Sequence, residues 1–71
     1  MGTVAEKIRI AMIKRKLSLK DLAARMGTTP QNLSNKLKRD NFSEDEIRKI
    51  AAAMNAFVKI SFILHDSGEE L

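Results

Sequence analysis

Hydrophobic residues recur three and four positions apart in four stretches of the chain, which is the period of an α-helix with one buried face. Each stretch follows a hydroxyl residue that can cap a helix, namely Thr3, Ser18, Thr29 or Ser43. The pattern predicts a mainly α fold with four helices, the first over residues 4–16. The expected inward-facing positions are Val4, Ile8, Ala11, Met12, Leu19, Leu22, Ala23, Met26, Pro30, Leu33, Leu37, Ile47, Ile50, Ala51 and Met54.

The hydrophobic period changes to two over residues 57–64, FVKISFIL, where β-branched and aromatic residues dominate. This pattern predicts a strand. Residues 66–68 signal a turn, but the chain then stops at Leu71, too soon for a full second hairpin strand. Because a lone strand cannot satisfy its own backbone groups, its expected partner is the same strand of a second copy. The expected dimerisation residues are Phe57, Val58, Ile60, Phe62 and Leu64.

The two middle helices are predicted to form a helix-turn-helix over residues 18–39. Gly27 follows the first helix at the place where a left-handed residue ends it, and glycine takes that conformation without a Cβ clash. Thr29 can cap the next helix at once, with Pro30 at its first position, where no N–H is needed. The turn is therefore tight. The polar residues left on the outer face of the second helix are Gln31, Asn32, Ser34, Asn35 and Lys38.

Amide side chains at the start of an exposed helix suit DNA, because Gln or Asn can bond adenine N7 and N6 together in the major groove. The sequence GTTPQNLSN of residues 27–35, preceded by LAARM at 22–26, resembles the helix-turn-helix of the phage repressor/Cro family and its XRE-type relatives. The resemblance covers residues 4–55 and implies a four-helix repressor-like domain. It places the base-reading positions on Pro30, Gln31 and Asn32, with Asn35 one turn further on.

The chain departs from the family pattern at three places. Leu19 stands where relatives often have a phosphate-binding Gln, and Pro30 replaces a frequent polar reader. Met12 and Leu37 occupy the positions of an Arg–Glu pair found in many relatives. This double exchange is compatible with stability, since packed apolar side chains can replace a buried ion pair.

Composition limits the chemistry that the chain can perform. Seventy-one residues make one small domain, expected to comprise a DNA-binding unit over residues 1–56 and a C-terminal strand and tail over 57–71. The chain has no cysteine and one histidine, His65, which excludes disulfides and a zinc site. We expect no cofactor, no small-molecule ligand and no catalytic role. No apolar run could span a bilayer and no signal peptide is visible, so a cytoplasmic protein without membrane contact is expected.

Charge is distributed unevenly along the chain. The net charge is +4, yet residues 1–40 hold ten basic and three acidic side chains, a balance of +7, whereas residues 41–71 hold three basic and six acidic ones, a balance of −3. The positive half coincides with the helix-turn-helix, as expected for a protein that binds a phosphate backbone.

These observations predict a homodimeric, sequence-specific regulator that binds double-stranded DNA, with base contacts from Gln31, Asn32 and Asn35. A competing interpretation of the amides is that they only solvate an exposed helix. The alternative function is a protein-interaction module that keeps this fold without reading DNA. Ile10 and Ile13 lie off the main apolar stripe and are expected to be covered by the fourth helix, the strand or a partner chain. The residues expected to contact phosphate or base are Ser18, Lys20, Arg25, Thr28, Thr29, Ser34, Lys36 and Lys38.

Overall fold

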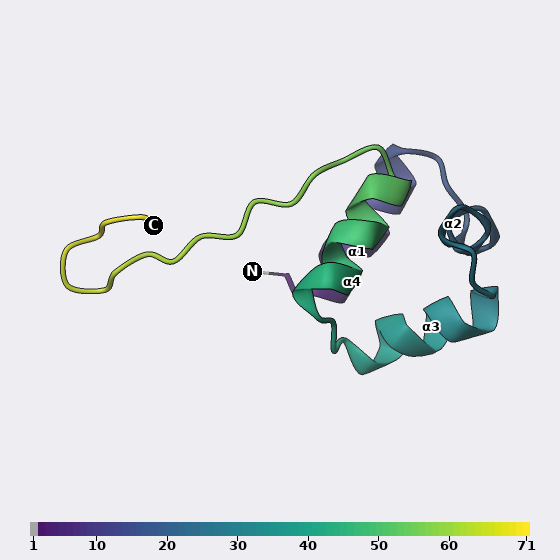
Figure 1. Ribbon diagram of the computed structural model, residues 1–71, viewed down its shortest axis with the longest axis horizontal. Coiled ribbons are helices and arrows are strands. Elements are labelled where there is room, and N and C mark those ends of the chain that lie inside the picture. The colour runs from purple at the N-terminus through teal and green to yellow at the C-terminus, as the bar shows by residue number, and fades with distance from the viewer. Residues whose placement is uncertain (1) are drawn as a thin grey trace.

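The computed structural model describes residues 2–71, and these contain four helices, which confirms the mainly α architecture. Figure 1 shows the helices as one body, with α1 and α4 running side by side and the residues after α4 leaving the body as a long arm. The arm makes the molecule elongated, with extents of 43 × 23 × 20 Å. No helix within residues 2–71 is long and apolar enough to cross a membrane. The helices are α1 (Val4–Lys14), α2 (Leu19–Met26), α3 (Pro30–Arg39) and α4 (Glu44–Ala53).

The ends of the helices follow the capping signals in the sequence. Ser18 and Ser43 each form a reciprocal capping box, with Asp21 and Glu46 respectively. Helix α1 ends at Lys14 and is therefore two residues shorter than predicted. Lys16 instead adopts a left-handed conformation, with φ of 56°, and this residue turns the chain toward α2.

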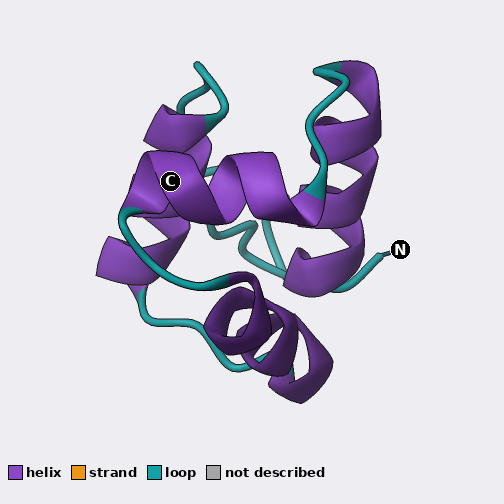
Figure 2. Ribbon diagram, turned by 90° about the vertical axis from the view of Figure 1, so that its right-hand side faces the viewer, coloured by secondary structure: helices purple, strands orange, loops and turns teal. Residues whose placement is uncertain are grey.

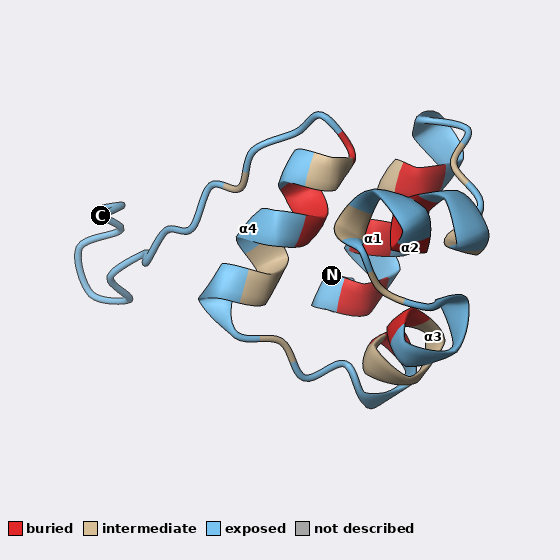
Figure 3. Cartoon of the chain, turned by 45° about the vertical axis from the view of Figure 1, so that its right-hand side comes forward, coloured by how far each residue is buried: buried red, intermediate tan, exposed pale blue. Residues whose placement is uncertain are grey.

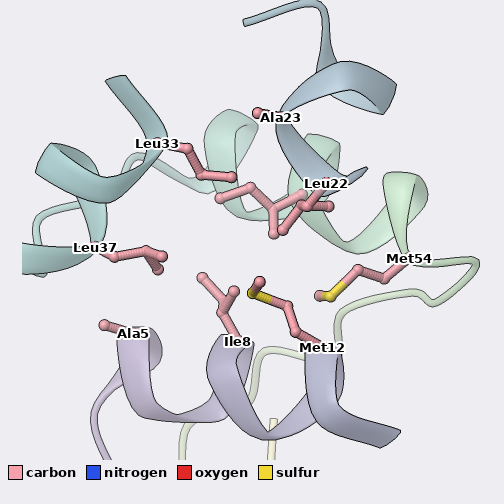
Figure 4. Packing of buried hydrophobic residues seen from close by; sticks show 9 residues of the cluster. Ala5, Ile8, Met12, Leu22, Ala23, Leu33, Leu37 and Met54 are labelled. Atoms are coloured by element: carbon pink, nitrogen blue, oxygen red, sulfur yellow. The ribbon is translucent and has the colours of Figure 1, made fainter. Parts of the chain in front are cut away.

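One hydrophobic core joins the helices, and Leu22 of α2 is fully buried within it (Figure 4). Met12 and Leu37 both belong to this core, so the apolar pair that replaces the family's charged pair is packed as expected. Two predicted inward positions are wrong, because Val4 and Pro30 are exposed, and each is the first residue of its helix. The buried residues, red in Figure 3, are Ala5, Ile8, Met12, Leu22, Ala23, Leu33, Leu37, Ile50, Ala51 and Met54.

The structure corrects the strand expected over residues 57–64. Within the described residues this segment forms no strand and runs away from the helices, which provide no edge for it to pair with (Figure 1). Its last part pairs inside the same chain: the Leu64 N–H donates to Glu69 O at 2.8 Å and the Leu71 N–H donates to Phe62 O at 2.7 Å. The residues after the turn, expected to be too few to pair, therefore close a small hairpin.

The apolar side chains of the arm are largely uncovered. Phe57 is 93% exposed and Phe62 71%, so most of the alternating face predicted to pack on the helices stays uncovered, although the start of the arm lines a pocket with α1 and α4. Val58 alone in that set is half-buried. Ile10 and Ile13 on α1 are also exposed, and neither α4 nor the arm covers them.

Candidate nucleic-acid interface

The turn between α2 and α3 has the geometry that its sequence predicts. Gly27 is left-handed, with φ of 71° and ψ of 30°, and the Thr28 N–H reaches back to Ala23 O at 3.0 Å. The Thr29 hydroxyl then accepts a hydrogen bond from the Asn32 N–H at 3.1 Å, which starts α3. In Figure 1, α2 is seen end-on while α3 lies across the view, so the turn sets the two helices at a steep angle. The same four-helix body is seen from the side in Figure 2.

Two of the three predicted base-reading amides form a pair on the outer side of α3. Gln31 Nε2 donates to Asn35 Oδ1 at 3.2 Å, one helical turn further on. This bond leaves the Gln31 carbonyl oxygen and the Asn35 amino group without a partner among the described residues. The pair therefore presents one free acceptor and one free donor, and the hydrogen bond between the two side chains restricts their rotation.

Asn32 lies on a different side of α3. It lines a groove between α3 and α4 together with Thr28 and Lys36 on one wall and Glu46 and Lys49 on the other. The structure thus separates the predicted reading residues into an outward pair and a third amide that faces the flank of the helix.

The cations near α3 are not equally available. Lys36 Nζ lies 2.8 Å from Glu46 Oε2, so this lysine already has an anionic partner. The hydrogen bond from Lys36 and, as the second largest cause, the one from the Ser43 N–H lower the pKa of Glu46 to about 2. Arg25 donates from Nη1 to the Ala53 carbonyl oxygen at 3.1 Å and so contacts the end of α4. By contrast, Lys20 and Lys38 are exposed and form no ion pair within residues 2–71.

The start of α2 is occupied by its own capping box. The Ser18 hydroxyl accepts from the Asp21 N–H, and the Ser18 N–H donates to Asp21 Oδ2, both at 3.1 Å. These hydrogen bonds lower the pKa of Asp21, so a carboxylate stands beside this helix terminus. Thr28 and Ser34 are half-buried, and Thr29 is exposed.

Sequence reasoning missed Lys49, which lines the same groove as Thr28 and Asn32. The lysine lies in the acidic half of the sequence, where charge counting drew no attention to it. Lys49 lies three residues after Glu46 and so on the same face of α4. This spacing indicates its position only after the Lys36–Glu46 ion pair shows that Glu46 faces α3.

The described residues hold no cluster of side chains that could bind a metal ion. No curated protein and no solved structure matches the chain. A family model described as a Cro/C1-type helix-turn-helix DNA-binding domain matches residues 7–56, which include α2, the turn, α3 and α4. The chain therefore belongs to the Cro/C1-type helix-turn-helix family of DNA-binding domains.

Proposed function

We propose that this protein is a sequence-specific transcriptional regulator that inserts α3 into the major groove of a palindromic operator as a homodimer. The observation that carries this proposal is the hydrogen-bonded pair of Gln31 and Asn35 on the outer side of α3. Adenine presents an acceptor at N7 and a donor at N6, which complement the donor and acceptor of the amide pair. Holding two amides together before binding reduces the rotamer entropy lost on contact with a base.

The remaining contacts divide between bases and phosphates. Asn32 contacts a base or the adjacent backbone from the flank of α3. Lys20 and Lys38 supply the non-specific attraction to phosphate, because neither forms an ion pair within residues 2–71. Ser18, Thr28, Thr29 and Ser34 set the register through hydroxyl and backbone groups. Lys36 and Arg25 reach DNA only by sharing or giving up their present partners.

The dimer is proposed to form through the arm, with Phe57, Val58, Ile60, Phe62 and Leu64 as its residues. Two features support this assignment. The exposed apolar side chains lack cover, and the segment has an unpaired edge. Recognition helices must also be held roughly 34 Å apart to read two half-sites on one face of DNA.

Selection of binding sites from a random duplex pool tests the proposal directly. A regulator enriches one sequence with two-fold symmetry, and its binding weakens steeply with salt. A protein-interaction module enriches no sequence and shows no steep salt dependence. Sedimentation at several protein concentrations, carried out in parallel, separates the dimer from the DNA-binding claim.

A further inference from the structure

A groove of about 210 Å³ lies between the flank of α3 and α4. Its floor is apolar and its rim is polar. Asn32 lines it, whereas Gln31 and Asn35 do not, so the groove is on the flank of α3 and not on the face of the amide pair. The lining residues are Met26, Thr28, Asn32, Leu33, Lys36, Glu46, Lys49 and Ile50.

The charges on this rim leave one cation without a partner. Lys36 and Glu46 neutralise each other at 2.8 Å, and the low pKa of Glu46 keeps it ionised at neutral pH. Lys49 forms no ion pair in the part of the chain that the structure describes. The rim therefore carries a net positive charge of one, together with the Thr28 hydroxyl and the Asn32 amide as hydrogen-bond donors.

We propose that Lys49 binds a phosphate of the DNA backbone, with Thr28 and Asn32 as hydrogen-bonding partners, so that α4 contributes a contact from outside the helix-turn-helix. This inference rests on the proposed reading of DNA by α3. The major groove is about 12 Å wide and a helix with its side chains is about 10–12 Å across, so phosphates lie against the flanks of an inserted helix. The groove is on such a flank and holds the matching charge.

Glu46 has a second effect in this arrangement. Its carboxylate lies on the rim that receives the phosphate, so it both holds Lys36 and repels the approaching anion. Replacing Glu46 by Gln therefore frees a lysine and removes a negative charge from the interface. Glu46 limits non-specific affinity for DNA.

The test measures the salt dependence of binding to a random-sequence duplex for the full chain and four variants. Lys49→Gln flattens the slope of log K against log salt by about 0.9, the value for one phosphate contact on B-DNA. Lys49→Arg keeps the wild-type slope because it keeps the charge. Glu46→Gln steepens the slope. Lys7→Gln is the matched control. Lys7 is also an exposed lysine without an ion pair among the described residues, but it lines the groove between α1 and α4.

An unchanged slope in Lys49→Gln overturns the inference while leaving the proposed function intact. An equal flattening in Lys7→Gln also overturns it, because the effect would then come from net charge and not from position. A wild-type chain that binds no duplex overturns the proposed function, and the Lys49 contact with it. Circular dichroism of each variant checks that the helical content is unchanged.

Discussion

The carboxylate of Asp40 accepts a 2.9 Å hydrogen bond from the backbone N–H of Ala5, 35 positions earlier in the chain. The first N–H groups of a helix have no partner within the helix, so this contact satisfies one of them at the start of α1. Asp40 also ends α3 in a left-handed conformation, with φ of 51°. One residue thus ends the proposed recognition helix and anchors it to α1.

We expect Asp40→Gly to reduce the free energy of unfolding by about 0.5–2 kcal/mol, the usual range for loss of a helix-capping side chain. Glycine takes the left-handed backbone freely, so this variant removes the hydrogen bond without adding conformational strain. Asp40→Asn keeps an acceptor oxygen and should lose less. Urea unfolding of the three proteins measures the difference, and a Gly variant as stable as wild type would show that the bond contributes nothing.

Gln31→Ala should weaken binding to the selected operator by about 1–3 kcal/mol, the value of one bidentate base contact. Asn35→Ala should have a similar effect, and the two losses should not add, because each replacement breaks the same amide pair. Asn32→Ala should weaken binding to the selected and the random duplex alike, because Asn32 is proposed to contact a phosphate. Fluorescence anisotropy on selected and random duplexes gives the comparison, and an equal loss on both would assign Gln31 and Asn35 to the backbone or to the fold.

Acidification should destabilise the protein through Glu46. Its pKa falls from 4.5 to about 2 in the folded chain, so its contribution to stability is present above pH 4.5 and is lost as the pH falls toward 2. Thermal unfolding across this range should show a shallower pH dependence for Glu46→Gln. Lys36→Gln should have the same effect, since the lysine is the largest cause of the shift. A wild-type pH profile in both variants would contradict the role of the ion pair.

Gly27→Val should destabilise the fold through the backbone alone, because a Cβ placed there meets no atom within 4 Å. The left-handed conformation costs an ordinary residue roughly 1–2 kcal/mol, and a β-branched one suits it badly. Gly27→Asn is the control, since asparagine tolerates this conformation. Melting temperatures should therefore fall in the order Gly, Asn, Val, and a valine variant with the wild-type temperature would contradict this order.

Ser61→Pro should disrupt the proposed dimer more than Ile60→Pro. The N–H groups of Phe62 and Leu64 are used inside the hairpin, and neighbouring N–H groups of an extended segment point to opposite edges. The Ser61 N–H is therefore on the open edge. Proline removes that donor, whereas Ile60 lies on the edge of the hairpin.

Analytical ultracentrifugation at protein concentrations of roughly tens of micromolar checks this prediction. These concentrations lie well above a dissociation constant of ~1 μM, which corresponds to a binding free energy of about −8 kcal/mol. The wild-type chain and Ile60→Pro should sediment as dimers and Ser61→Pro as a monomer. A wild-type monomer at these concentrations would exclude the arm as a dimerisation element.

The features that could be predicted from sequence are those fixed by neighbouring residues. Ser18, Gly27 and Thr29 act within a few positions of themselves, so their caps and the turn were predicted correctly. Contacts between distant elements carry no such local signal. Neither the Lys36–Glu46 ion pair nor the Arg25 contact with α4 could be inferred from spacing along the chain.

The arm shows the same limit for strands. Alternation predicted an extended segment at residues 57–64 but could not specify what it pairs with, because a ladder depends on a second segment. Residues 69–71 pair with this segment and form the hairpin, because the short connecting loop makes the entropy cost of closing it small. The inward position predicted for Pro30 was wrong for a different reason. A helical period shows which face of a helix is buried, but not where the core ends along the helix axis.

The last turn of α4 contains no basic residue, and two arginines from elsewhere donate to the carbonyl groups at its end. Arg25 of α2 donates to Ala53 O, and Arg15, at the end of α1, donates to Asn55 O at 3.2 Å. The arm begins at this point. Hydrogen bonds from α1 and α2 thus hold the point where the arm leaves α4, so the start of the arm is fixed to the helical body while its apolar side chains stay exposed.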